Sequence, residues 1–342
     1  MNNDEKRNIT VPLSTYNLLV NDAHQFEVMK KNGHDVNMNR FLSMFLKEYY
    51  DDYSSYRKNM HDRIVDELGD SVPQNKRDEI ATNIINTIIL PVVKKGDDKE
   101  SKKVSLKPTK ETEFIIAKIE AEAGAEDSFT HYFLRMINRY CHEPRYERER
   151  IIFRSNYDLL MRCCSNKQEI AFSLKWDKKK VHTVIPYQLS VGQDETHNYL
   201  LCTEYNNEKK TDIVRVYRLN RIDSISTTYS GKSLNPDLIR YLELTKKYGS
   251  QHAINTDVNI QVKMNEFGLR MYNRIYTDRP ERNSLEKTEE GYYIMGFHCS
   301  EQQVLNYFKR FSKQDSEILS PQNLRNEMIS FHQSALNNYI EK

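Results

Sequence analysis

Hydrophobic and polar positions in the first 50 residues follow a strand period and then a helix period. Residues 8–13 alternate, with Ile9 and Val11 set between Asn8 and Thr10, which predicts a short strand with one buried face. Two stretches of helical period follow, one on each side of Gly33. Their apolar positions are Leu18, Leu19, Ala23, Phe26 and Met29, then Phe41, Leu42, Phe45, Leu46 and Tyr49.

The same order of patterns returns at residues 103–141. Val104 and Leu106 alternate with lysine and serine, Thr109 can cap a first helix, and Ser128 or Thr130 a second one. Gly124 stands where Gly33 stands in the first copy. The apolar positions of the second copy are Phe114, Ile115, Ile119 and Ala123, then Tyr132, Phe133, Met136, Ile137 and Tyr140. The chain therefore carries a strand–helix–helix unit twice.

Two such units can pair their strands into one antiparallel ribbon within a single chain, because a lone short strand cannot satisfy its edges. This arrangement resembles the ribbon–helix–helix fold. The resemblance implies that the outer face of the ribbon meets nucleic acid, as it enters the DNA major groove in that family. The side chains expected on this face are Asn8, Thr10, Ser105 and Lys107. The alternative is that they are polar only because the face meets water.

From Ile151 the pattern changes to short strands separated by polar turns. The runs at residues 168–176, 179–190, 197–205 and 212–225 predict a small β-barrel.

Motifs in these strands resemble the signature of WYL domains. The matching segments are Pro186-Tyr187-Gln188-Leu189, then Tyr199-Leu200, then Arg215 to Ile222, while Asn198 and Asn220 stand where the family has tryptophan and aspartate. The resemblance implies an Sm-like, SH3-type barrel with a basic and aromatic ligand surface. It assigns nucleic-acid or ligand binding to Tyr199, Arg215, Arg218 and Arg221.

Spacing leaves the geometry of these arginines open. Arg218 and Arg221 are three residues apart, so they face opposite sides of a regular strand and converge only if it bulges or ends near Asn220. In the alternative interpretation, one arginine pairs with a carboxylate such as Asp223. The hairpin lysines Lys178, Lys179 and Lys180 contact a nucleic-acid backbone or simply meet water.

The last part of the chain predicts a small α+β extension that resembles the one following WYL domains, where it often mediates dimerisation. The expected class is therefore α+β multidomain. Its domains are a tandem ribbon–helix–helix unit over residues 1–148, a WYL barrel over 149–230 and a C-terminal extension over 231–342.

The arginines at 270, 274, 279 and 282 form a second candidate nucleic-acid surface, or a solvated helix face.

Composition narrows the functional classes. The formal charge is only +2, so any nucleic-acid surface requires local segregation of charge. The cysteine spacing suggests neither a disulfide framework nor a zinc site, and no signal peptide or membrane span is expected, which favours a cytoplasmic protein. Nucleophile elbow, P-loop and dinucleotide motifs are absent, so we expect no enzyme, no cofactor and no metal. Two pairs with the spacing of the HEPN ribonuclease motif, Arg135/His142 and Arg325/His332, are interpreted as chance.

A ribbon–helix–helix unit in front of a WYL barrel resembles the accessory proteins of type VI-D CRISPR systems. The resemblance implies a non-enzymatic homodimer that binds single-stranded RNA and stimulates an RNA-guided effector ribonuclease, with no membrane partner. A DNA-binding transcriptional regulator whose WYL barrel senses a ligand is the first alternative. A dimerising scaffold without nucleic-acid affinity is the second.

Overall fold

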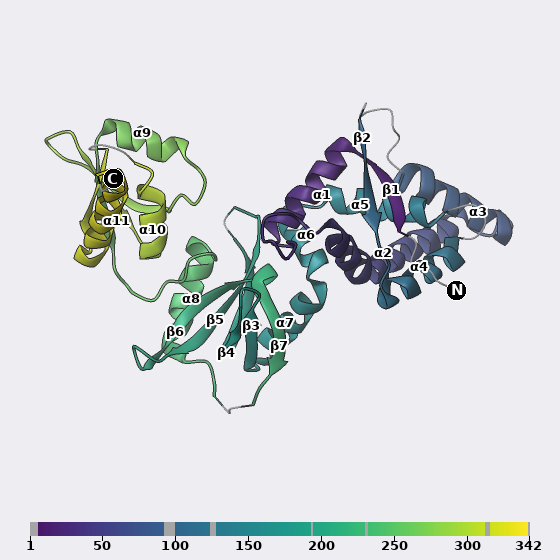
Figure 1. Ribbon diagram of the computed structural model, residues 1–342, viewed down its shortest axis with the longest axis horizontal. Coiled ribbons are helices and arrows are strands. Elements are labelled where there is room, and N and C mark those ends of the chain that lie inside the picture. Colours follow the sequence, from purple (N-terminus) through teal and green to yellow (C-terminus); the bar gives the residue numbers. More distant parts are fainter. Residues whose placement is uncertain are drawn as a thin grey trace. The chain divides into compact units, whose positions relative to one another are not determined.

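The computed structural model describes residues 6–91, 100–123, 128–192, 194–229, 232–311 and 315–340. Gly124 lies outside these ranges. The chain divides into two compact units, Met1–Asp158 and Leu159–Lys342, and the division falls within α7 (Arg154–Asn166). Helices combine with three antiparallel sheets across the described ranges (Figure 1), so the α+β class is confirmed.

The first unit is built on a two-stranded ribbon. β1 (Arg7–Pro12) pairs antiparallel with β2 (Ser101–Leu106), and Ile9 lies opposite Val104. Alternation decides which face is buried, since Ile9, Val11, Val104 and Leu106 are all withdrawn from solvent. The pairing of both strands within one chain, expected from the repeat, is present (Figure 1).

Each ribbon strand leads into two helices. β1 is followed by α1 (Leu13–Gln25) and α2 (Met38–Leu68), and β2 by α4 (Lys110–Ala123) and α5 (Phe129–His142). Asn37 caps α2 by accepting from the Arg40 amide, and Ser128 caps α5 by accepting from the His131 amide. The remaining elements are α3 (Gln74–Ile84), the π-helical turn η1 (Ile85–Ile89) and α6 (Arg145–Ile152).

Aromatic rings from both copies of the repeat interlock in the core. Phe45 on α2 lies 5.5 Å from Tyr49, 5.6 Å from Phe133 and 5.2 Å from Tyr140 between ring centroids. The prediction that Phe114 belongs to the core is wrong. Phe114 is 63% exposed, because the buried stripe of α4 runs instead through Thr112, Ile116 and Ile119, which share one helix face.

The second unit begins with a five-stranded sheet in the order β6-β5-β4-β3-β7 (Figure 1). Its edge strands β6 and β7 are joined by only three residues, the 3₁₀ helix η3, so the end of β6 and the start of β7 lie close together. The prediction of a closed barrel is wrong. The sheet is open, because the chain leaves the extended conformation at η3 and, within the described residues, β6 does not pair with β7. The elements are β3 (Ile170–Leu174), β4 (Asp177–Val191), β5 (Asn198–Asn206), β6 (Thr211–Arg218), η3 (Leu219–Arg221) and β7 (Ile222–Thr227).

A helix absent from the sequence expectations covers part of this sheet. Leu242 on α8 (Pro236–Tyr248) packs with Leu201 of β5 and Val214 of β6. The side chain of Asn255, beyond α8, accepts from the Val214 amide (2.7 Å) and donates to its carbonyl (3.0 Å). This face of the sheet is therefore covered by the chain that follows it.

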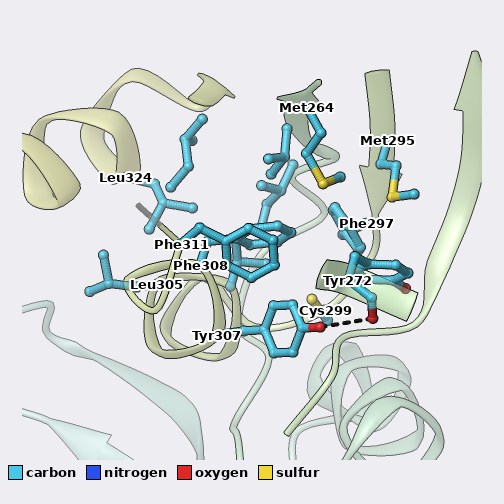
Figure 2. Packing of buried hydrophobic residues seen from close by; sticks show 14 residues of the cluster. Met264, Tyr272, Met295, Phe297, Cys299, Leu305, Tyr307, Phe308, Phe311 and Leu324 are labelled. Atoms are coloured by element: carbon cyan, nitrogen blue, oxygen red, sulfur yellow. Dashed lines mark hydrogen bonds between the residues drawn. The ribbon is translucent and has the colours of Figure 1, made fainter. Parts of the chain in front are cut away.

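The last part of the chain forms a four-stranded sheet in the order β11-β8-β10-β9. Figure 2 shows its core, where Phe297, Phe308 and Phe311 pack together and the Tyr307 hydroxyl donates to the Tyr272 carbonyl (3.0 Å). Strand β9 was not expected, because all six of its residues are exposed and show no alternation of apolar positions. The elements are β8 (Ile260–Met264), α9 (Glu266–Arg274), β9 (Arg282–Lys287), β10 (Tyr293–Phe297), α10 (Glu301–Phe308), β11 (Ser316–Ser320) and α11 (Gln322–Ile340).

Candidate nucleic-acid interface

The arginine-rich run at residues 214–225 is two strands rather than one. β6 ends at Arg218, Leu219 and Asn220 turn inward and are buried, and β7 starts at Ile222. The apolar Leu219 and Ile222 anchor this turn in the sheet interior. The strand therefore ends between Arg218 and Arg221. The two side chains do not have to face opposite sides of one regular strand.

Arg215 belongs to the opposite sheet face from Arg218 and lies against a carboxylate. Its Nε is 3.4 Å from Oε2 of Glu204, and about half of its side chain is exposed. The same Glu204 accepts from the Tyr217 hydroxyl (2.6 Å), and its Oε1 lies 2.8 Å from His182 Nδ1. Burial and the bond to Glu204 raise the pKa of Tyr217 well above its ordinary value, so the phenol stays a neutral donor. Part of the Arg215 charge is thus already balanced within the protein.

Arg218 and Tyr199 lie directly opposite each other on β6 and β5. The Arg218 guanidinium contacts Nε2 of His197, and because arginine only donates, this imidazole nitrogen accepts. Tyr199 packs against the cluster formed by Leu201, Val214 and Leu242. The tyrosine therefore supports the sheet and helix α8 with at least part of its ring.

Arg221 lies under an aromatic ring that the sequence reasoning missed. Its guanidinium carbon is 5.1 Å from the ring centroid of Trp176, a cation–π contact. Trp176 stands in the turn between β3 and β4, next to the exposed lysines Lys178, Lys179 and Lys180. A lone tryptophan inside the lysine-rich segment Lys175–Lys180 was the feature of the sequence that could have identified this aromatic residue as part of the site.

The structure brings the four predicted side chains together only in part. Tyr199 and Arg218 are neighbours, Arg221 lies across the short turn with a different partner, and Arg215 is on the other face. Asp223, the carboxylate considered as an arginine partner, lies 3.1 Å from Lys178 Nζ. The arrangement is a basic rim around η3 rather than one closed anion pocket.

The two departures from the WYL signature are both buried. Asn198 is almost completely withdrawn from solvent, and Asn220 is completely withdrawn. Neither side-chain atom of Asn220 has a hydrogen-bond partner among the described residues. A buried amide without partners costs stability, so Asn220 lowers the stability of the turn.

The predicted ribbon contacts lie on the exposed side of β1 and β2 or just beyond it. The Ser105 hydroxyl donates to the Asn8 side chain opposite it (2.6 Å), and Thr10 lies opposite the exposed Lys103. The Lys107 amide donates to Asn39 Oδ1 at the start of α2 (2.6 Å). The outer face and its margin therefore present hydrogen-bonding groups and the lysines Lys103 and Lys107, with Asn8 and Ser105 already engaged with each other.

Arg325 and His332, one of the two pairs with ribonuclease-like spacing, both line a groove of about 690 Å³ between α10, β11 and α11. Arg325 is engaged there, since it lies 2.7 Å from Glu317 and donates to the Ile318 carbonyl (3.0 Å). In the other pair, Arg135 is buried and His142 Nδ1 contacts the Asn138 carbonyl oxygen (2.7 Å). Within the described ranges no group of three or more metal-ligating side chains gathers as a metal site would require.

Comparisons with known proteins extend the description of the fold. No family model matches the chain, and no curated protein matches its sequence. A solved structure described as a CRISPR Cas-related protein is 20% identical, with a TM-score of 0.67, and the match covers 98% of this chain and 94% of that one. The likeness establishes a shared fold over nearly the whole length.

A second structure, proteasome accessory factor B/C (PafBC) of Arthrobacter aurescens, is 12% identical with a TM-score of 0.24, over 69% of this chain and 37% of that one.

Across the described ranges, no helix has the length and apolar character needed to cross a membrane.

Proposed function

We propose that this protein is a non-enzymatic accessory protein that binds single-stranded RNA and stimulates an RNA-guided type VI-D CRISPR ribonuclease. The observation that carries the proposal is the basic rim around η3, in which Arg218, Arg221 and the lysines of the β3–β4 hairpin gather in a chain of nearly balanced charge. Segregated cations of this kind attract a phosphate backbone. The full-length fold likeness to a CRISPR Cas-related protein supports the choice of system.

The physical route to stimulation is local concentration. A homodimer with two single-strand sites holds RNA near the effector, so the second contact becomes intramolecular and avidity rises by up to about 10²–10⁴. No metal, cofactor or catalytic side chain of this chain takes part.

The test is a cleavage time course with purified effector and guide RNA, with and without this protein. We expect faster cleavage with the protein, a stimulation that falls as salt rises, and no cleavage by the protein alone. An unchanged rate argues against the accessory role. RNA degradation without effector, lost in the His332→Ala or His142→Ala variant, would show that the protein is a nuclease.

A DNA-binding regulator is the second candidate, and the ribbon favours it. Asn8 and Ser105 lie opposite each other on the exposed side of an antiparallel ribbon, where side chains can reach base edges in a major groove. Binding measurements with matched single-stranded RNA, single-stranded DNA and duplex DNA separate the two. Tight sequence-specific binding to a duplex, together with an unchanged effector rate, selects the regulator.

A further inference from the structure

Trp176 is the chain's sole tryptophan, and it is 61% exposed at the turn between β3 and β4. Tryptophan gains more than most side chains from packing, because its ring has a large apolar surface. The side chain is nevertheless left mostly in solvent, at the tip of a hairpin rather than in the nearby core. Its exposed ring is therefore available to a partner.

The indole is held in place before any partner arrives. The Arg221 guanidinium carbon lies 5.1 Å from its ring centroid, and the Arg221 carbonyl accepts from the Lys175 amide (3.0 Å), which fixes the backbone beside the ring. Lys178, two residues further on, is paired with Asp223 of β7 (3.1 Å). A ring fixed in this way loses little conformational freedom on binding.

The surroundings of the ring are positively charged. Lys179 and Lys180 are exposed beside it, and the cations of this hairpin and of η3 outnumber the nearby Asp177 and Asp223. A flat aromatic surface among cations is the combination with which single-strand binders hold bases and phosphates together. A nucleotide of a single strand presents the π-face of its base to the ring and its phosphate to the lysines, so it matches both features at once.

We propose that Trp176 is a stacking platform for one base of a single-stranded RNA, with Arg221 behind the ring and Lys179 and Lys180 facing the adjacent phosphates. This deepens the proposed function and rests on it. It also moves the base contact away from Tyr199, whose ring packs against the Leu201, Val214 and Leu242 cluster.

The full-length protein supplies its own probe, since all tryptophan fluorescence comes from Trp176. The protein is titrated with an oligouridylate of about 12 nucleotides, within the site size of single-strand binders. A second titration uses an abasic ribose-phosphate oligomer of equal length. Binding of each oligomer is followed independently by fluorescence anisotropy of an end label. We expect both to bind and only the base-containing oligomer to quench Trp176 by stacking.

Variants measure the contribution of the ring. Trp176→Ala should weaken oligouridylate binding by about 5- to 150-fold, and Trp176→Phe should restore part of the affinity. The abasic oligomer should bind both variants as tightly as it binds the wild type. Tyr205→Ala is the matched control. Tyr205 is an exposed ring beside a lysine, with Lys232 Nζ at 5.7 Å, in the β5–β6 hairpin of the same sheet. Its loss should leave the affinity unchanged.

The outcomes separate this inference from the proposed function. If neither oligomer binds, the RNA-binding function fails and the platform with it. Binding without quenching, equal quenching by the abasic oligomer, or wild-type affinity in Trp176→Ala each overturn the platform alone. Wild-type RNA affinity with lost effector stimulation in Trp176→Ala would assign the ring to a protein partner instead.

Discussion

At the scale of single residues, Asp22 shows how one buried carboxylate joins the two copies of the repeat. It lies on α1 and is completely buried. It accepts from the Tyr140 hydroxyl of α5 (2.8 Å) and from Nε and Nη2 of Arg148 on α6 (2.6 and 3.0 Å). Burial and the nearby Asp22 raise the pKa of Tyr140 well above its ordinary value, so the phenol remains a donor.

Replacing Asp22 with asparagine should destabilise the first unit strongly. The variant leaves the buried Arg148 charge without a counter-ion, which typically costs about 3–5 kcal/mol of unfolding free energy. Denaturant unfolding of the first unit measures the loss. Asp70→Asn is the control, because its carboxylate is fully exposed and 3.4 Å from Arg77, and it should change stability by less than about 1 kcal/mol. Equal effects in both variants would contradict a structural role for Asp22.

Removing both Arg218 and Arg221 should weaken single-strand binding and its dependence on salt. Each lost phosphate contact lowers the slope of log affinity against log salt by about 0.7. Binding isotherms across a salt series measure this slope. The control variant Lys209→Ala/Arg240→Ala removes the same charge from exposed positions elsewhere in the second unit. An Arg218→Ala/Arg221→Ala variant that folds and binds like the wild type would mean that the arginines are structural.

At the scale of elements, the ribbon decides how the first unit is assembled. β1 and β2 supply each other's hydrogen-bond partners within one chain, and the rings of α2 and α5 pack in one core. Two strands separated by nearly a hundred residues are therefore satisfied without a second molecule.

Residues 1–158 alone should consequently form a folded monomer at micromolar concentration. Sedimentation velocity measures the mass, and circular dichroism with thermal unfolding checks that the fragment is folded. Ile9→Asp serves as a control, because a charge at this buried ribbon position should prevent folding. An obligate dimer of the wild-type fragment would mean that the ribbon forms between chains.

At the scale of the whole molecule, helix α11 has more apolar surface than its own fold uses. Among its nineteen residues only Leu324 is buried. The exposed apolar side chains are Ile329, Phe331, Leu336, Tyr339 and Ile340. Exposed apolar surface on this scale is typical of an association site, and the proposed dimer would use it.

Leu336→Asp combined with Tyr339→Ser should convert the proposed dimer into a monomer. Charge and lost apolar area disfavour association, whereas folding should be little affected because both side chains are exposed. Sedimentation equilibrium reports the mass. Tyr229→Ser, at a strongly exposed ring outside α11, is the control and should leave the mass unchanged. A dimer that survives the double change would place the interface elsewhere.

Local patterns in the sequence were sufficient to predict that the ribbon and its helices exist. Alternation of Ile9 and Val11, and of Val104 and Leu106, predicts the buried ribbon face because neighbouring residues of a strand point to opposite sides. Ser128, one of the two residues considered as the cap of the second helix, does cap it, and this contact is equally local because a cap contacts the amide three residues ahead. The α+β class follows from the same patterns. The WYL resemblance and the roles of its arginines stay predictions.

Only the tertiary structure decided which partner each charged or aromatic side chain has. Arg218 meets His197 because β5 and β6 pair in one register. Arg221 meets Trp176 because β7 pairs with β3, so that Ile222 lies opposite Leu174 and the Arg221 carbonyl accepts from the Lys175 amide. Phe114 is exposed because the helix face of Ile116 and Ile119 turns inward. Such contacts join residues distant in sequence, so strand register and helix rotation select them, and neither is encoded in local spacing.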